Sequence, residues 1–366
     1  MFTYVPPIGA PKSEIDTPAL LINHEALDRN IAKMSAFMRG TSAKLRPHSK
    51  THKSAQIAQK QIAAGAVGIT CAKLGEAEAL ADGGIGDILI ANQIIGPIKI
   101  ARLVELARRC QIAVAVDQAD NVRALSEAAS AADVTIRCLV EVNVGMNRCG
   151  VEPGEPALAL ARQVAESKGL TFGGIQAYEG HLQNLMPFAE RKARVLTDMQ
   201  KAVDTKHFIE SHGLRVPVIS GSGTGTYMVT ASRMPDVNEI QAGSYATNDA
   251  TYKAVGADFE NALTLLVTVI SRPTPDIAVI DAGMKAMTHE FGMPTVTVEG
   301  ATIKSLSEEH GKLAVTGAAS DLRVGDKIEI IPSHGCTTIN LHDNFYVMED
   351  ERLMDVWKIV GRGKFQ

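Results

Sequence analysis

Short apolar runs alternate with longer amphipathic stretches over the first two thirds of the chain. Apolar runs of four to eight residues between turn residues are typical of buried strands, whereas apolar positions three and four apart indicate helices. Strand-like and helical patterns follow one another regularly, so each strand is succeeded by a helix. The eight predicted strands lie near residues 44–47, 67–71, 88–91, 112–116, 136–144, 172–178, 216–220 and 239–246.

This alternation predicts parallel strand pairing and hence an α/β fold. Eight strand–helix units predict a (β/α)8 TIM barrel. The rival is an open doubly wound sheet, whose dinucleotide fingerprint GxGxxG would follow the first strand. Residues 47–53 instead have the sequence Pro-His-Ser-Lys-Thr-His-Lys. The pattern therefore favours the barrel.

The pattern changes after about residue 254, where short β-rich segments are separated by turn residues. Such a succession predicts a C-terminal antiparallel β domain. The barrel therefore ends near this point and a second domain begins at residue 255. The predicted strands of that domain are residues 262–271, 277–281, 295–298, 312–315, 327–332, 344–348 and 353–360.

Composition and charge restrict the class of partner. The 366 residues are 45% hydrophobic and 21% charged, which supplies a buried core and argues against disorder. The net charge of -4 excludes a broad polyanion-binding surface, and 4% aromatic residues argue against base-stacking platforms. A nucleic-acid partner is therefore not expected, and a small molecule remains the expected ligand.

The distribution of apolar residues and cysteines predicts a cytoplasmic protein. No stretch approaches the roughly 20 apolar residues of a membrane span, so no membrane partner is expected. The Pro-rich residues 1–12 contain no apolar segment typical of a signal peptide. The five cysteines are scattered and contain no CxxC, which favours a reducing compartment over a disulfide framework.

The loops after the seventh and eighth strands are candidates for binding a phosphate. Barrels react at the carboxyl ends of their strands and often bind a phosphate in these two loops. Residues 221–226 are Gly-Ser-Gly-Thr-Gly-Thr, and a second small-residue turn occurs at Gly243 and Ser244. Glycines let backbone N–H groups approach a ligand closely, and hydroxyls add donors. A flexible surface loop is the alternative, while a Walker A site is excluded because no Gly-Lys-Ser/Thr follows.

Lys50 and Arg148 are the candidate cations at the same end of the barrel. Lys50 follows the first strand, where desolvation would make its amine nucleophilic. Beside a phosphate site, such a lysine fits a Schiff base with pyridoxal 5'-phosphate. Arg148 follows the fifth strand and could bind a phenolate or carboxylate. An ordinary exposed lysine and a surface salt bridge are the respective alternatives.

His334 and Cys336 form a candidate metal pair in the β domain. Alternate residues of an extended segment point to the same side, so imidazole and thiolate could grip one divalent ion. Zinc is favoured by a nitrogen and sulfur pair. A catalytic zinc needs three protein ligands, and the third is not visible, so water or substrate would complete the sphere. A polar histidine beside a buried cysteine is the alternative, and the nearby His342 and Asp343 could equally be structural.

These motifs together resemble a known family. Residues 47–53, 145–150, 176–178, 221–225 and 332–336 occur in this order, with residues 239–245 and 281–283 between the last two. The set resembles the fold-type III pyridoxal-phosphate enzymes, in the branch of D-serine dehydratase, D-threo-3-hydroxyaspartate dehydratase and D-threonine aldolase. The resemblance covers nearly the whole chain, and the barrel is also similar to that of alanine racemase.

The resemblance implies roles for individual residues and an assembly. It implies a homodimer and an N-terminal segment that packs with the β domain, which places the domains at residues 20–254 and at residues 1–19 plus 255–366. It gives Lys50 and the pair His334 and Cys336 catalytic roles, the pair as metal ligands. The implied cofactor-binding residues are Lys50, Arg148, Tyr178, Ser222, Gly223, Thr224, Gly225, Gly243, Ser244 and Tyr245.

The implied activity is that of a pyridoxal-phosphate- and metal-dependent lyase acting on β-hydroxy D-amino acids. The aldolases of the branch tend to carry a carboxylate as second metal ligand, which suits manganese or magnesium, whereas a thiolate suits zinc. The His-Gly-Cys run is more similar to the dehydratases and favours elimination of water, giving a 2-oxo acid and ammonia. The alternatives are an aldolase giving glycine and an aldehyde, an amino-acid racemase, and a non-catalytic pyridoxal-phosphate carrier.

Overall fold

The structure, a computed structural model that describes residues 5–366, divides into two compact units. The sheet unit contains the chain up to Ala32, the short segment Thr51–Ser54, and Ser244–Arg362. The barrel unit contains all other described residues, from Lys33 onward. Residues 1–4 of the predicted segment 1–19 lie outside the described residues.

The barrel unit is built on eight parallel strands in the order β2-β9-β8-β7-β6-β5-β4-β3. The edge strands are joined where His48, just beyond β2, forms a parallel bridge with Thr70 of β3. The predicted (β/α)8 barrel is thereby confirmed. Its strands are β2 (Lys44–Leu45), β3 (Ile69–Cys71), β4 (Asp87–Ile90), β5 (Gln111–Val116), β6 (Ile136–Glu141), β7 (Leu170–Ala177), β8 (Ile219–Gly221) and β9 (Glu239–Ile240).

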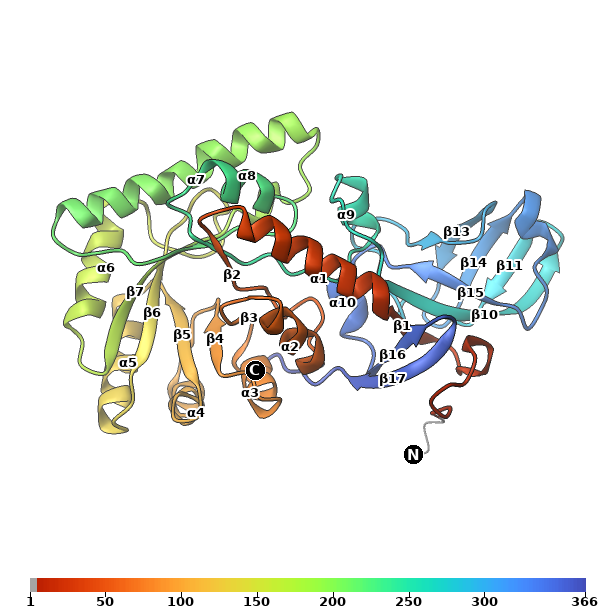
Figure 1. The fold of residues 1–366 in the computed structure, drawn as a ribbon, viewed down its shortest axis with the longest axis horizontal. Coiled ribbons are helices and arrows are strands. Elements are labelled where there is room, and N and C mark those ends of the chain that lie inside the picture. Colours follow the sequence, from red (N-terminus) through yellow and green to blue (C-terminus); the bar gives the residue numbers. More distant parts are fainter. Residues whose placement is uncertain (1–4) are drawn as a thin grey trace. The chain divides into compact units, whose positions relative to one another are not determined.

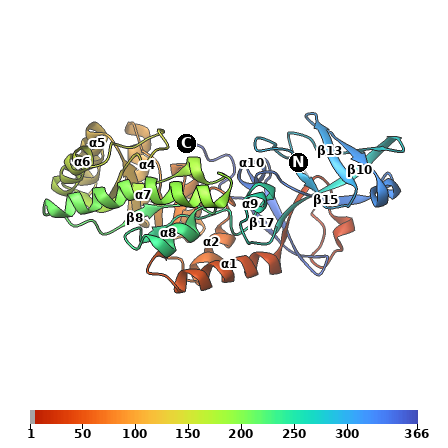
Figure 2. The same cartoon turned by 90° about the horizontal axis from the view of Figure 1, so that it is seen from above.

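A helix follows each of the strands β2 to β8, and consecutive helices from α3 to α8 pack against one another around the strands (Figure 1 and Figure 2). The preceding helix α1 (His24–Arg39) shows why such segments are helical. Its residues Leu27, Ile31, Met34 and Met38 recur at helical spacing and are all buried. The other helices are α2 (Ala55–Ala63), α3 (Leu74–Asp82), α4 (Pro97–Ala107), α5 (Ala119–Ala131), α6 (Glu155–Glu166), α7 (Phe188–Ser211) and α8 (Tyr227–Arg233).

A buried ion-pair network joins Arg46, which directly follows β2, to the first residues of β4 and β9. Arg46 donates from Nε to Glu239 at 2.9 Å and from Nη1 to Asp87 at 2.8 Å. Asp87 belongs to β4, which does not pair with β2, so this contact links two strands that are not neighbours. The Arg46 side chain is only 4% exposed. The network lies at the end of the barrel opposite to that where such folds carry their chemistry.

The sheet unit contains a mostly antiparallel nine-stranded sheet, as predicted for the C-terminal third. Its main path is β13-β14-β11-β10-β1-β16-β17, and β15 pairs with both β10 and β12. One pair, β1 with β16, is parallel. The strands are β1 (Ala19–Asn23), β10 (Leu263–Thr274), β11 (Ile277–Ile280), β12 (Thr295–Val296), β13 (Ala301–Leu306), β14 (Gly311–Val315), β15 (Lys327–Ile331), β16 (Asn344–Glu349) and β17 (Arg352–Lys358).

The limits of the two units differ from the predicted boundaries at residues 20 and 254. Strand β1 pairs with β10 and β16, so its residues belong to the sheet unit and not to the barrel. Its first four residues, Ala-Leu-Leu-Ile, are all buried, which requires a central position with neighbours on both sides. At the other boundary the sheet unit already begins at Ser244.

Two features of the described chain bear on its surroundings. All five cysteines are free. Within residues 5–366, no helix combines the length and the apolar character that crossing a membrane would need.

Candidate functional site

The barrel unit brings three of the predicted cofactor-binding side chains together. The Lys50 Nζ lies 5.4 Å from the centroid of the Tyr178 ring, and the Arg148 Cζ lies 5.7 Å from the same centroid. Lys50 follows β2, Arg148 follows β6 and Tyr178 directly follows β7. The carboxyl ends of separate strands therefore converge as the barrel geometry predicts.

The loop that carries Arg148 is shaped by local hydrogen bonds. The Asn143 side-chain oxygen accepts from the backbone N–H groups of Gly145 and Asn147, both at 3.1 Å. Gly145 and Asn147 have positive φ values of 129° and 54°, which glycine and asparagine tolerate better than other residues. Further along, Gly150 donates its N–H to Asp117 at 3.0 Å. The run 145–150 is thus a turn with a defined shape that presents Arg148.

The Gly/Ser/Thr loop after β8 is buried and tightly packed. Its Gly225 N–H donates to the Gln183 side-chain oxygen at 3.0 Å, and the Ser222 and Thr226 hydroxyls are 2.8 Å apart. A Cβ added at Gly225 would lie 2.1 Å from the Gln183 carbonyl oxygen, so only glycine fits there. Thr224 is 3% exposed. The loop is therefore a fixed part of the barrel and not a mobile surface loop.

Glu179 lies completely buried beside this loop, directly after Tyr178. Burial raises the pKa of its carboxyl group above the usual range. Among the described residues, neither of its carboxyl oxygens has a hydrogen-bond partner.

The predicted residues around the end of β9 have different surroundings. Gly243 is required by space, because a Cβ there would lie 2.3 Å from the His48 carbonyl oxygen, two residues before Lys50. In the sheet unit, the Ser244 hydroxyl lies 3.3 Å from that of Thr51. Tyr245 is fully buried, with its ring 5.5 Å from that of Phe259.

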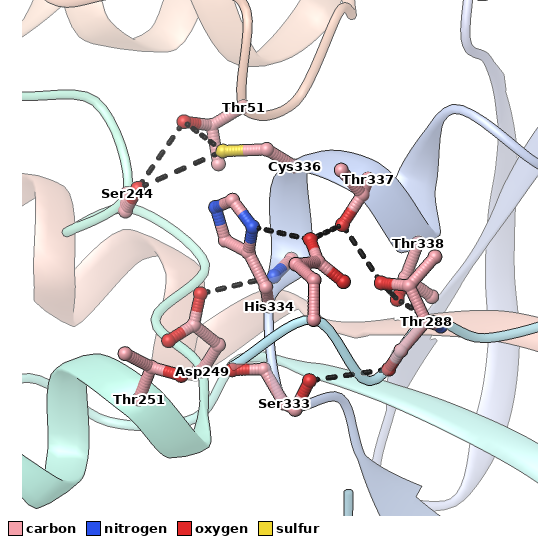
Figure 3. A network of polar contacts seen from close by, with 12 residues as sticks. Thr51, Ser244, Asp249, Thr251, Thr288, Ser333, His334, Cys336, Thr337 and Thr338 are labelled. Atoms are coloured by element: carbon pink, nitrogen blue, oxygen red, sulfur yellow. Dashed lines mark hydrogen bonds and ion pairs between the residues drawn. The ribbon is translucent and has the colours of Figure 1, made fainter. Parts of the chain in front are cut away.

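The sheet unit brings His334 and Cys336 side by side, with two hydroxyl groups near the thiol (Figure 3). His334 follows β15, and Cys336 lies in the short helix α10 (Gly335–Ile339). The Cys336 Sγ is 3.3 Å from the Thr51 hydroxyl and 4.0 Å from that of Ser244. Thr51, the residue after Lys50, and Ser244 are both buried.

Two carboxylates hold the His-Gly-Cys run. The Glu290 Oε1 lies 2.8 Å from the His334 Nδ1 and also accepts a hydrogen bond from the Thr337 hydroxyl. The buried Asp249 accepts the Gly335 N–H at 2.9 Å with one oxygen. Its other oxygen caps helix α9 (Ala250–Ala254). The run is therefore anchored through its backbone and through the histidine ring.

These contacts shift the pKa values of the groups involved. Burial by itself lowers the pKa of His334, but the charge of Cys336 and hydrogen bonds to Cys336 and Glu290 outweigh it and raise it to about 9. Burial by itself raises the pKa of Glu290, yet hydrogen bonds with Thr337 and Thr288 outweigh it and lower it to about 2. A divalent cation at His334 must therefore displace a proton from the imidazole.

The two candidates near this pair are engaged elsewhere. His342 lies with its Nε2 2.7 Å from the Ala286 carbonyl oxygen, and Asp343 forms an ion pair with Arg362 at 3.3 Å. Over residues 5–366 no cluster of three or more His, Cys, Asp or Glu side chains could hold a metal ion. Within that part of the chain, the pair His334 and Cys336 is thus a set of two candidate ligands.

The residues present fit both the implied cofactor, pyridoxal phosphate, and the implied divalent metal. In the barrel unit, an amine and a guanidinium lie over one aromatic ring, and the glycines at 225 and 243 allow backbone to pack where a Cβ would collide. This set suits an anionic aromatic aldehyde such as pyridoxal phosphate. In the sheet unit, one imidazole nitrogen and one thiol suit a borderline divalent cation.

Glu290 and Asp249 were not predicted from the sequence. Glu290 lies 44 residues before His334, and Asp249 lies 86 residues before Gly335. Neither has a spacing that relates it to the metal pair. Only the Asp281-Ala282-Gly283 motif marks the start of the loop that carries Glu290.

Comparison with family descriptions divides the chain at nearly the same point as the sequence pattern. Residues 22–250 match "Alanine racemase, N-terminal domain", and residues 262–348 match "Putative serine dehydratase domain". The first match covers more than half of the chain.

Individual relatives extend over almost the whole length. A D-threonine aldolase from an Arthrobacter species is 39% identical over 97% of this chain and 95% of its own. The solved D-threonine aldolase of Filomicrobium marinum has a TM-score of 0.95 and 38% identity, covering 98% of this chain and 99% of its own. A solved D-threo-3-hydroxyaspartate dehydratase, with a cysteine replaced by alanine and in the metal-free form, has a TM-score of 0.87 and 28% identity. It covers 95% of this chain and 98% of its own.

Proposed function

Because this chain belongs to the family of pyridoxal-phosphate-dependent lyases that contains D-threonine aldolases and D-threo-3-hydroxyaspartate dehydratases, we propose that it cleaves β-hydroxy D-amino acids to glycine and an aldehyde. The observation that carries this proposal is that the aldolase relatives are 38–39% identical to this chain over nearly its whole length, whereas the solved dehydratase is 28% identical. The sequence favoured water elimination on the His-Gly-Cys run alone. Two residues weigh less than a resemblance over the full length, so the aldolase takes precedence.

The barrel unit is proposed to hold the cofactor. Lys50 would hold pyridoxal phosphate through its amine and would take or return the proton at the substrate's Cα, while Tyr178 and Arg148 would hold the cofactor's ring and its phenolic oxygen. When bound, the cofactor supplies an electron sink for the bonds at Cα. The contacts of Lys50 and Arg148 with one aromatic ring support this assignment. In the barrel unit the phosphate is assigned to Ser222, Gly223, Thr224, Gly225 and Gly243. Ser244 and Tyr245 belong to the sheet unit, and their part in cofactor binding stays a prediction from the family resemblance.

The sheet unit is proposed to hold a divalent metal at His334 and Cys336. A cation there would supply Lewis acidity toward a substrate hydroxyl group. Zinc is proposed because a thiolate prefers it, with manganese or magnesium as the alternatives. The description of one solved dehydratase relative as a metal-free form supports a metal in this family. Both Lys50 and the metal pair are then needed for turnover.

Dehydration remains the second candidate, because the His-Gly-Cys run at residues 334–336 favours it. The two reactions differ in which bond breaks. In the aldol cleavage the β-hydroxyl group loses its proton and the Cα–Cβ bond breaks, whereas in the dehydration the hydroxyl group leaves as water after Cα–H breaks. The same residues can serve either course, so the products decide.

Product analysis tests the proposal directly. The purified protein, supplied with pyridoxal phosphate and zinc or manganese, is incubated with D-threonine, D-serine and the 3-hydroxyaspartate isomers. Glycine with an aldehyde is the expected result. Ammonia with a 2-oxo acid would contradict the aldolase and indicate a dehydratase, and inversion at Cα without cleavage would indicate a racemase. Cofactor binding with none of these products would indicate a non-catalytic carrier protein.

Two further assignments belong to the proposal. The protein is proposed to be a homodimer, as the family resemblance implies. A cytoplasmic location is proposed because all five cysteines are free, which suits a reducing compartment. Light scattering coupled to size-exclusion chromatography tests the dimer, and a mass of one chain would contradict it.

A further inference from the structure

One carboxylate of the sheet unit, that of Glu290, contacts the candidate metal ligand His334. The Glu290 Oε1 lies 2.8 Å from the His334 Nδ1 (Figure 3). The Glu290 side chain is 35% exposed and that of His334 is 19% exposed. An ionised carboxylate can only accept a hydrogen bond, so Nδ1 carries the proton and donates.

The carboxylate of Glu290 is itself held in place. The Thr337 hydroxyl donates to the same Oε1, and the Thr288 hydroxyl lies 2.7 Å from that of Thr337. The Thr288 N–H donates to Thr338 at 3.2 Å, and the Ser333 hydroxyl donates to the Thr288 carbonyl at 3.1 Å. These bonds tie the loop that carries Glu290 to both flanks of the His-Gly-Cys run. A solvent-exposed ion pair of two free side chains would have no such support.

The same loop also places an aromatic ring beside the imidazole. The Phe291 ring lies with its centroid 4.9 Å from that of His334, at an interplanar angle of 60°. The His334 ring is thus in contact with both Glu290 and Phe291. Its Nε2 faces away from Glu290 (Figure 3).

We infer that Glu290 is a positioning residue that orients His334 so that Nε2 is the atom presented to a divalent cation. The inference rests on the proposed metal pair. A metal-binding histidine commonly donates its other ring N–H to a carboxylate, which sets the tautomer and the ring orientation. Glu290 would act in this way without touching the metal or the substrate.

This role predicts a larger effect on metal affinity than on folding. Loss of such a carboxylate weakens metal binding by about 10–100-fold. As a partly exposed ion pair alone, the contact would contribute little to stability and nothing specific to metal binding. Metal affinity and stability, measured on the same variants, therefore distinguish the two interpretations.

The test is a cobalt(II) titration of the full-length protein after metal removal, followed by the absorption band that a thiolate–cobalt bond produces. Glu290→Ala is expected to weaken cobalt affinity about 10–100-fold relative to the unmodified protein. Glu290→Gln is expected to weaken it less, because its amide oxygen still accepts from Nδ1–H. Glu309→Gln is the matched control, since it removes a carboxylate that pairs with Lys285 on the surface of the same unit. Its cobalt affinity is expected to remain unchanged.

The outcomes separate this inference from the proposed function. Cobalt affinity of Glu290→Ala equal to that of the unmodified protein would overturn the inference while leaving the metal pair in place. Absence of a cobalt–thiolate band in the unmodified protein, or a band that persists in Cys336→Ala, would overturn the metal pair and the inference together. Denaturant unfolding of the metal-free variants serves as the stability measurement. An affinity loss no greater than that explained by unfolded protein would also overturn the inference.

Discussion

The two units build their candidate sites by different means. In the barrel unit, Lys50, Arg148 and Tyr178 each follow a parallel strand, and the topology alone brings them together. In the sheet unit, the His-Gly-Cys run is held by Glu290 and Asp249, which come from loops and caps with no common relation to the strands.

This difference shows which of the two sites can be located from the topology of the fold. A closed parallel barrel has one end at which every strand finishes, so residues far apart in the sequence share one location. An antiparallel sheet has strand ends on both sides, and its loops lead in many directions. The barrel residues should therefore respond as a set, whereas the metal pair should depend on individual supporting contacts.

The largest effect is expected at Lys50. Replacing it by alanine removes the amine proposed to hold the cofactor and to move the Cα proton, so activity should fall by at least about 10²–10⁴-fold. The protein should also lose the cofactor's absorption at the violet edge of the visible spectrum. Lys44→Ala, an exposed lysine of β2, is the control and should keep both properties. Cofactor colour retained in Lys50→Ala would contradict the assignment.

The buried ion-pair network at the opposite end of the barrel should affect stability and not chemistry. Arg46→Ala leaves the Glu239 carboxylate with the Ser220 hydroxyl and the Asp87 carboxylate with the 3.4 Å contact to Arg137, which is expected to cost up to about 3–5 kcal/mol in free energy of unfolding. Denaturant unfolding of the protein and of the variant measures this difference in the free energy of unfolding. Arg39→Ala, at an exposed helix end, should change it by less than about 0.5 kcal/mol. Similar values for the two variants would show that the network does not stabilise the barrel.

An intermediate effect is expected from exchanging one metal ligand. Cys336→Asp replaces a thiolate by a carboxylate, which suits manganese or magnesium better than zinc. The ratio of manganese to zinc affinity should rise by about tenfold. This change is comparable to the loss of metal affinity caused by replacing a residue that hydrogen-bonds to a metal ligand. Competition titration with a chromophoric chelator measures the ratio. An unchanged ratio would indicate that Cys336 does not contact the metal.

The smallest effect is expected at a partly buried ion pair near the start of β9. A hydrogen bond from Lys206, at 2.9 Å, lowers the pKa of Asp236. A lowered carboxyl pKa contributes stability above the unfolded value, about 3.9, and this contribution is lost as the pH falls through the folded value. Asp236→Asn should therefore be less stable by up to about 1 kcal/mol at pH 7, with the difference vanishing in acid. Thermal unfolding measured across this pH range checks the trend, and a constant difference would contradict it.

Prediction from the sequence was most reliable for residues whose position follows from the repeating strand–helix alternation of the barrel. The eight strands and the positions of Lys50 and Arg148 after their strands follow from the alternation, because each apolar run must be buried between helices. The pair His334 and Cys336 was visible only as a spacing of two. The choice between elimination and aldol cleavage was not visible in that pair, because both reactions use the same residues.

The sequence by itself determined the barrel, the β-rich third and the identity of the groups that can react, since apolar periodicity and residue chemistry are local properties. Only the tertiary structure decided which distant residues support them. Strand β1 joined the sheet unit because its apolar run needed a neighbour on each side. Likewise, Glu290 came to His334 through a loop whose path depends on hydrogen bonds to Ser333, Thr337 and Thr338. Such contacts arise when the chain closes on itself, so no spacing along the sequence encodes them.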